Sequence, residues 1–328
     1  MKKALVFVVL IAVAIIVVVL TQKDTKIDTT PLFRITENDK IGFININGEV
    51  VIQPKYVFSD SDRYVEGLAT VKVGQKWGYI NPKGKVVIKQ KYDWAKDFSG
   101  GLAAVTVRQR VGFINRKGKM VIEPQFDAVE AFSEGLAAVA IDYKWGYINT
   151  KGEIVIEPQF AGDSAEAFSE GLATVKSNDK YGYINKNGSM EIDPIFDFAY
   201  KFSEGLAAVS KDGKVGYINQ MGTYVIKPQF SHGEPFSEGI AAVSINWKFG
   251  YINKNGNIVI KLKYDGAWSF SGGLAAVSNN FKWGYIDKKG NLVINIDFDW
   301  AKDFQDGLAA VGFNNEPRYI NMAGEFVW

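Results

Sequence analysis

One segment of about 34 residues repeats along this chain from residue 31 to its end. Its clearest copies read KWGYINPKGKVVIKQKY from Lys76, KWGYINTKGEIVIEPQF from Lys144 and KWGYIDKKGNLVINIDF from Lys282. A glycine recurs at spacings of 34 or 36 residues, at Gly42, Gly78, Gly112, Gly146, Gly182, Gly216, Gly250 and Gly284, with Arg318 in the ninth place. A fixed period of this length indicates a repeat architecture, in which each unit covers its apolar faces with the next one.

The composition of each unit favours strands over helices. Two further glycines keep fixed places, six residues after the first one and eleven before it, and only Pro31 departs from this pattern. Helical repeats of the same period exist, but three glycines per unit and a Val-Ile pair flanked by turn residues do not form helix pairs. We therefore expect an all-β fold.

The first hairpin of a unit can be predicted from its turn. In GLAAVSKDGKVGYINQMGTYVIKPQF, which starts at Gly205, Asp212-Gly213 is a two-residue hairpin turn because both positions need positive φ. Pairing outward from this turn aligns LAAV with the following GYI segment. The predicted partners are Lys211 with Lys214, Val209 with Gly216, Ala208 with Tyr217 and Ala207 with Ile218.

The second hairpin follows from Asn219 and Gly222, which suit a type I turn with a left-handed last position. Each unit is then a three-stranded meander with two apolar faces, followed by a connector that ends in FSEG and that we expect to contain a short helical turn. One predicted face carries Ala208, Tyr217 and Val225, and the other carries Ala207, Ile218, Tyr224 and Ile226. The double alanine and the central glycine leave room for a neighbouring sheet or ring to approach.

Residues 31–328 thus predict a domain of nine three-stranded antiparallel meanders in series. We expect an open superhelical, solenoid-like stack, with a closed β-propeller-like ring as the alternative. Nine blades exceed the usual ring size of about four to eight. The last unit also ends at EFVW, and no N-terminal strand is left over to seal a ring.

The first 20 residues are predicted to form a membrane helix. Lys2 and Lys3 precede 17 uninterrupted apolar residues, from Ala4 to Leu20, which is the short edge of the spanning range. No pair of small residues marks a cleavage site, so we expect a single-pass anchor in the cell membrane with the repeat domain extracytoplasmic. The alternative is a cleaved signal peptide and a secreted protein. Residues 21–30 are polar and are expected to form a linker.

Composition excludes several function classes. The 38 basic and 36 acidic residues leave a net charge of +2, which does not indicate a nucleic-acid partner. Cysteine is absent and His232 is the one histidine, so we expect no catalytic residues, no cofactor and no metal site. An acid precedes the LAAV glycine at Glu66, Glu134, Glu170, Glu204, Glu238 and Asp306. These carboxylates could bind cations, but turn capping or solvent exposure explains them more economically.

The recurring pattern GLAAV…KWGYIN…G…VI.P.F…FSEG resembles the WG-repeat family, named for its tryptophan-glycine pair. The tryptophan itself stands only at Trp77, Trp145 and Trp283, and other side chains such as Val111 and Pro317 replace it elsewhere, which indicates core filling and not chemistry. The resemblance implies a bacterial and often exported array that binds other molecules. The family has no shared catalytic residues to carry over.

The positions that vary between repeats are the candidates for a ligand surface. Connector slots hold aromatic side chains at Phe58, Trp94, Phe198, Tyr200, Trp268 and Trp300, which suit stacking on sugars or peptides. The alternative is that they fill gaps between units. We therefore predict a non-enzymatic binding or scaffold protein displayed in the bacterial envelope, with a protein or cell-wall polymer as partner. An envelope enzyme such as a glycan hydrolase, and a purely structural spacer, are the alternatives.

Overall fold

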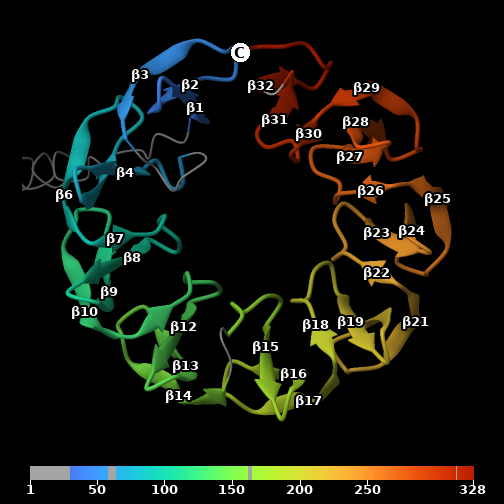
Figure 1. Cartoon of the computed structure of the whole chain (residues 1–328). Coiled ribbons are helices and arrows are strands. Elements are labelled where there is room, and N and C mark those ends of the chain that lie inside the picture. Colours follow the sequence, from blue (N-terminus) through green and yellow to red (C-terminus); the bar gives the residue numbers. More distant parts are fainter. Residues whose placement is uncertain (1–29, 58–63, 162–164, 315) are drawn as a thin grey trace, which may run out of the picture.

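The computed structural model describes residues 30–57, 64–161, 165–314 and 316–328. These residues form a closed ring of nine antiparallel blades around a central opening (Figure 1). The predicted all-β class and the nine units are confirmed, whereas the predicted open stack is wrong and the propeller-like alternative is right. The described residues contain strands, turns and bends and no helix, so the short helical turn expected in the connectors is also wrong there.

Eight blades are built from three long strands that follow one another outward from the ring axis, and blade 9 has the first two of them. The first are β1 (Phe33–Glu37), β4 (Ala69–Val73), β8 (Leu102–Val107), β12 (Leu136–Ile141), β15 (Leu172–Ser177), β19 (Ala207–Lys211), β23 (Ile240–Ile245), β27 (Leu274–Asn279) and β31 (Leu308–Phe313). The second are β2 (Lys40–Ile44), β5 (Lys76–Ile80), β9 (Arg110–Asn115), β13 (Lys144–Asn149), β16 (Lys180–Asn185), β20 (Lys214–Ile218), β24 (Lys248–Asn253), β28 (Lys282–Asp287) and β32 (Glu316–Asn321). The outer ones are β3 (Val50–Tyr56), β6 (Val86–Tyr92), β10 (Met120–Phe126), β14 (Ile154–Ala161), β17 (Met190–Phe196), β21 (Tyr224–Phe230), β25 (Ile258–Tyr264) and β29 (Leu292–Phe298).

Six blades add a two-residue strand on the inner side that the sequence analysis missed. Figure 1 shows β18 and β22 nearer the central opening than β21 and β25. The connector that leaves an outer strand crosses to the inner edge of the next blade and pairs there before it reaches FSEG. These short strands are β7 (Trp94–Ala95), β11 (Ala128–Val129), β18 (Phe198–Ala199), β22 (His232–Gly233), β26 (Gly266–Ala267) and β30 (Trp300–Ala301).

The predicted register of the first hairpin is confirmed at all four pairs of the worked unit. The second hairpin differs, because a β-bulge in β21 places Ile226 and not Val225 opposite Tyr217. Val225 consequently points outward and is 46% exposed, while Ile226 is buried. The outer strand also continues through Pro228 to Phe230, since an edge strand tolerates a proline that donates no hydrogen bond.

The bulge explains the repeated glycine. A Cβ on Gly216 would lie 2.6 Å from the Ile226 carbonyl oxygen and 2.7 Å from the Pro228 nitrogen, so the outer strand of the same blade passes directly over this position. The close approach that the sequence indicated is therefore made within a blade and not by a neighbouring sheet. Arg318 is tolerated in the ninth blade because residues 326–328 form only a short third strand there.

Adjacent blades are joined by an aromatic contact and a hydrogen bond from the same tyrosine. The Tyr217 ring lies 4.9 Å from that of Phe236 in the next blade, and its hydroxyl donates to the Glu234 carbonyl at 2.9 Å. Both rings are buried. The same ring contact recurs at Tyr79–Phe98, Phe113–Phe132, Tyr147–Phe168, Tyr183–Phe202, Tyr251–Phe270 and Tyr285–Phe304.

The ring closes by side-chain packing between the first and last blades, without a shared strand. The C-terminus lies between β3 and β32 (Figure 1). Val327 and Trp328 pair back onto Tyr319 within the last blade, and Phe33, Ile44 and Leu308 pack beside them. The Tyr319 hydroxyl donates to the Arg34 carbonyl at 2.8 Å. The expectation of an open stack assumed that closure needs an exchanged strand, and the apolar faces of blades 1 and 9 make that unnecessary.

The predicted anchor over residues 1–20 and most of the predicted linker over 21–30 lie outside the described residues. Within the part of the chain that the structure does describe, no helix is long and apolar enough to cross a membrane.

Candidate functional site

The ring has two ends, which we name by the turns on them. The hairpin face carries the turns between the first and second strands of the blades, such as Asp212-Gly213. The loop face carries the FSEG loops and the Asn-x-x-Gly turns between the second and outer strands, such as Asn219 to Gly222. Each end thus presents repeated copies of the same turns or loops, and departures from the common pattern mark candidate functional positions.

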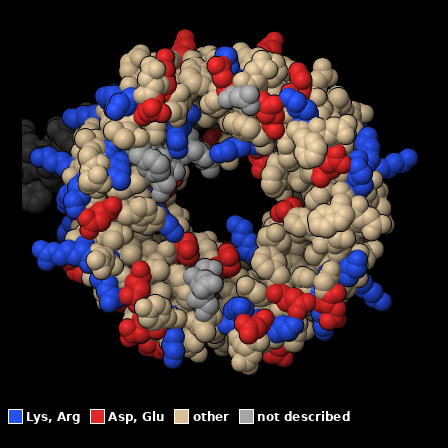
Figure 2. Space-filling model, viewed as in Figure 1, with Lys and Arg blue, Asp and Glu red and all other residues tan. Residues whose placement is uncertain are grey.

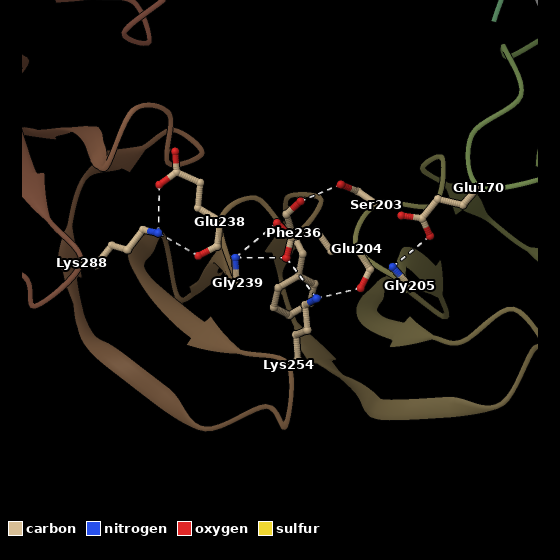
Figure 3. Close-up of polar contacts among 9 residues, drawn as sticks. All are labelled: Glu170, Ser203, Glu204, Gly205, Phe236, Glu238, Gly239, Lys254 and Lys288. Carbon is tan, nitrogen blue, oxygen red and sulfur yellow. Dashed lines mark hydrogen bonds and ion pairs between the residues drawn. The ribbon is translucent and has the colours of Figure 1, made fainter. Parts of the chain in front are cut away.

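On the loop face, the FSEG motif connects neighbouring blades (Figure 3). Ser203 Oγ donates to the Phe236 carbonyl of the next blade at 2.7 Å. Glu204 accepts the Gly239 N–H at 3.0 Å, and Lys254 Nζ lies 3.1 Å from the Glu204 carboxylate and 2.8 Å from its carbonyl oxygen. Glu204 itself has a φ of 55°, a left-handed conformation that residues other than glycine seldom adopt. The recurrent acid therefore acts as a clamp between blades.

The electrostatics of two clamps are altered accordingly. Burial disfavours the charged form of Glu238, but hydrogen bonds from Lys288 and from the Gly273 N–H outweigh it and lower the pKa of this carboxyl. Glu134 shows the same balance, with Lys186 and Gly171 as donors, and its pKa is also lowered. Capping, one of the two explanations given for the recurrent acids, is thus what these carboxylates do. Among the residues described, no group of three His, Asp or Glu side chains could hold a metal ion.

The acid and the lysine are absent together at one seam, which supports the clamp. At the seam between blades 8 and 9, Gly272 replaces the acid and Met322 replaces the lysine, with the Met322 Cε 3.9 Å from where a Gly272 Cβ would lie. At the closing seam, Ile46 stands in the lysine place and its Cδ1 is 3.0 Å from the corresponding point on Gly307. The seam between blades 8 and 9 has an apolar contact in place of the ion pair, whereas the closing seam keeps an acid, Asp306, and replaces only the lysine.

Of the six predicted ligand residues, the five that the structure describes are dispersed over blades 3, 6, 8 and 9 and do not form one surface. Trp94, Phe198 and Trp300 begin short inner strands, and the other two follow such strands. Phe198 and Tyr200 meet with ring centroids 4.9 Å apart, while Trp268 stacks on Trp283 at 5.7 Å and 10°. Phe58, also predicted, lies outside the described residues.

Three of the five fill space that the tryptophan of the repeat fills elsewhere. In each of the six blades with a short inner strand, three cross-strand neighbours form a lateral row whose middle residue is small. In five of these rows one end is large and the other is small, and in the sixth row His232 and Phe249 stand at the two ends. The rows are Trp94–Thr106–Val111, Ala128–Ala140–Trp145, Phe198–Ser210–Val215, His232–Ser244–Phe249, Gly266–Ser278–Trp283 and Trp300–Gly312–Pro317. Gap filling was the alternative explanation for these side chains, and it accounts for the positions of Trp94, Phe198 and Trp300.

Sequence reasoning missed three aromatic side chains at the tips of hairpins. Tyr143, Trp247 and Phe281 occupy the second turn position on the hairpin face and are 92%, 85% and 92% exposed. Their φ angles are 62°, 61° and 63°. Bulky side chains at positive φ are uncommon and destabilise the turn. The signal in the sequence is an aromatic residue at the turn position that Gly213 occupies in blade 6.

An aspartate links adjacent hairpin tips and holds them in place. Asp265 accepts a hydrogen bond from Lys248 at 2.6 Å and from the Asn280 N–H at 2.8 Å. Lys248 follows Trp247 and Asn280 precedes Phe281, so two aromatic tips are joined through one carboxylate. The hydrogen bond from Lys248, and then that from Asn280, lowers the pKa of Asp265. Asp127 makes the same link at the Tyr143 tip, where it contacts Arg110 and accepts the Asp142 N–H at 2.8 Å.

Among the residues that the structure describes, neither charge nor histidine chemistry marks a second site. Figure 2 shows Lys and Arg side chains interspersed with Asp and Glu around the ring, with the central opening clear in this view. His232 lies on β22, where its Nε2 is 2.8 Å from the Glu234 carboxylate and its ring is 5.8 Å from that of Phe249.

Comparison with known proteins identifies the repeat. The pattern described as "WG containing repeat" matches residues 41–77, 77–109, 112–145, 145–181, 181–214, 216–248, 249–283 and 283–316. No curated protein matches the chain.

Solved structures show the fold alone. A eukaryotic initiation factor superposes with a TM-score of 0.65 at 11% identity, covering 92% of this chain and 96% of that one. The dihydro-heme d1 dehydrogenase NirN (TM-score 0.49, 11% identity, 91% and 76% covered) and Kluyveromyces lactis Hsv2p (0.44, 11%, 69% and 91%) are more distant. The repeat matches cover most of the ring, and the chain belongs to the WG-repeat family.

Proposed function

We propose that this protein is a non-enzymatic binding ring, held at the bacterial envelope by its N-terminal segment. Its partner is a protein or a cell-wall polymer, and its contact surface is the hairpin face. The observation that carries this proposal is the set of three exposed aromatic tips, Tyr143, Trp247 and Phe281. Exposed aromatic side chains on strained backbone are expected where a surface is selected for contact and not for stability.

Hydrogen bonds already hold aromatic tips of the hairpin face in place, which supports this face as the contact surface. The bonds of Asp265 to the backbone of one tip and to the lysine beside another limit the movement of Trp247 and Phe281 before a partner arrives. Aromatic side chains contribute large contact areas with few rotatable bonds, so their ordering costs little entropy on binding. Many such contacts spread over a ring suit an extended partner better than a small molecule.

The direction of the first strands suits a ring whose hairpin face points away from an N-terminal anchor. β1 starts at Phe33 on the loop face, because the first strand of each blade runs from the loop face to the hairpin face. A chain entering from a membrane on that side leaves the hairpin face pointing outward. This orientation rests on the anchor expected over residues 1–20.

The experiment is capture of envelope components by the full chain. We would measure co-sedimentation with insoluble cell-wall polymer and, separately, cross-linking to purified envelope proteins. The test variant carries Tyr143→Gly, Trp247→Gly and Phe281→Gly, because glycine suits the same turn. The matched control carries Asp39→Gly, Gln109→Gly and Asp179→Gly at three corresponding tips that are not aromatic and that also have positive φ.

Loss of capture in the test variant and retention in the control would support the proposal. Equal capture by both would contradict a role for the tips, and no capture by the wild type would contradict the function. Release of soluble sugar fragments from the polymer would instead favour the envelope hydrolase.

A further inference from the structure

Blade 5 departs from its neighbours at the inner edge. Its connector is two residues longer, and its described residues form only the three long strands β15, β16 and β17. Thr174 occupies the second alanine position of LAAV, where the six blades with a short inner strand carry Ala104, Ala138, Ala208, Ala242, Ala276 and Ala310. Thr70 stands there in blade 2, the other repeat with a longer connector.

A cavity of about 370 Å³ opens at this place, between blades 5 and 6. Tyr181, Phe198 and Tyr200 supply its aromatic lining, with Phe198 5.6 Å from Tyr181 and 4.9 Å from Tyr200 between ring centroids. Lys176 and Lys201 also line it, and Lys176 Nζ lies 5.9 Å from the Tyr181 centroid. The cavity thus combines two predicted ligand residues with polar groups that the prediction had not included.

The Thr174 hydroxyl is the unusual group in this cavity. Thr174 is 2% exposed, and its Oγ1 is buried without a hydrogen-bond partner. Leaving a buried hydroxyl unpaired destabilises a fold, and alanine in the same slot of six other blades shows that the ring does not need it. A ligand group that reaches Oγ1 would satisfy it.

We propose that this cavity binds one or two units of a neutral or N-acetylated sugar. A sugar ring presents C–H faces that stack on aromatic side chains, and hydroxyls that pair with a neutral hydroxyl such as that of Thr174. Lysine side chains provide donors for the remaining sugar oxygens. The cavity size fits a mono- or disaccharide and is too small for a folded protein partner. This inference deepens the proposed function, on which it rests for the source of the sugar, a cell-wall polymer.

The test is titration of the full chain with N,N′-diacetylchitobiose and with maltose, followed by ligand-observed NMR and calorimetry. The dipeptide Ala-Ala serves as the peptide probe. Thr174→Val keeps the shape of the side chain and removes its hydroxyl, and Thr70→Val is the matched control in blade 2. Phe198→Ala removes an aromatic wall.

We expect millimolar or tighter binding of at least one sugar by the wild type and by Thr70→Val. Thr174→Val should bind about tenfold more weakly, which corresponds to one hydrogen bond, with an unchanged or higher Tm. A role of the hydroxyl in folding alone predicts a lower Tm and unaltered affinity, and that result would overturn the proposal. Binding of neither sugar, or of the dipeptide alone, would also overturn it.

The two proposals can fail separately. The variant with three glycine tips should retain sugar binding in the cavity while it loses capture of the polymer. Sugar binding without polymer capture by the wild type would leave the cavity assignment standing and remove the proposed function. Polymer capture by both the wild type and Thr174→Val, without binding of either sugar, would leave the proposed function standing and remove the cavity assignment.

Discussion

Gly266 and Trp283 share one lateral row in blade 8, where a Cβ on the glycine would lie 3.1 Å from Cη2 of the indole. The equivalent row of blade 3 has the reverse arrangement, with Trp94 on the inner strand and Val111 on the second strand. Each row therefore has space for one large side chain, and either end can supply it.

The first prediction exchanges the two ends of that row. Gly266→Trp alone should overpack blade 8 and lower the free energy of unfolding by about 1–3 kcal/mol, while Trp283→Val alone leaves a void and costs about 2–4 kcal/mol. The double variant reproduces the arrangement of blade 3 and should recover much of the loss. Chemical denaturation of all four proteins gives the coupling energy, and strictly additive losses would refute the shared row.

Trp247→Gly should stabilise the ring although it removes a large side chain. Trp247 is 85% exposed at a φ of 61°, so glycine relieves backbone strain and sacrifices little packing. We expect a gain of about 1 kcal/mol in the free energy of unfolding, measured by denaturant titration. Gln109→Gly, at a φ of 67°, is the control and should show a similar gain. A loss of stability in Trp247→Gly would mean that the indole packs on the ring.

The closing seam should respond to cavity formation in a way that other seams do not. Leu308→Ala and Leu206→Ala remove the same buried side chain from the closing seam and from an internal one, and each should cost about 2–5 kcal/mol. Only the closing seam lacks a covalent connection, so only Leu308→Ala should let the ring open.

Because the chain contains no cysteine, spin labels can be introduced at Asp39 and Glu316, across the closing seam, and at Asp212 and Asn246 across the internal one. Leu308→Ala should broaden the distance distribution of the first pair alone. Identical distributions in both variants would show that closure does not depend on this cluster.

Local turn chemistry explains which parts of the fold the sequence could predict. Asp212-Gly213 permits one turn type, so the register of the first hairpin followed from it. The bulge over Gly216 did not follow, because it depends on how the outer strand curves to pair again at Val215. Ring closure depends on contacts between residues 285 positions apart, such as Arg34 and Tyr319, and no periodic pattern encodes them.

The candidate site residues also differ in whether the sequence alone could predict them. An aromatic residue such as Trp94 is visible in a sequence, but its role depends on what stands across the sheet from it. The exposed tip at Phe281 could have been inferred from its place in a hairpin turn that favours glycine. The unpaired hydroxyl of Thr174 could not, because it depends on which groups of the neighbouring strands come within reach of it in the folded ring.

The last prediction concerns pH. The folded-state pKa values of Glu134 and Glu238 lie below 4.5, the ordinary value, because hydrogen bonds to Lys186 and Lys288 outweigh burial. A depressed pKa contributes stability that is fully present above the unfolded-state value and is lost as pH falls through the folded-state value. The Tm should therefore be level above about pH 5 and fall below it.

A variant with Glu134→Gln and Glu238→Gln should have a lower Tm at pH 7 and a flatter acid decline, because glutamine cannot be protonated in this range. Glu157→Gln, on an exposed site of β14, is the matched control and should follow the wild type. Parallel declines in the double variant and the wild type would show that the clamps contribute no measurable electrostatic stability. The ion pairs would then serve only to orient the loops of neighbouring blades, and the left-handed φ of each acid would have to be maintained by the Gly N–H bonds alone.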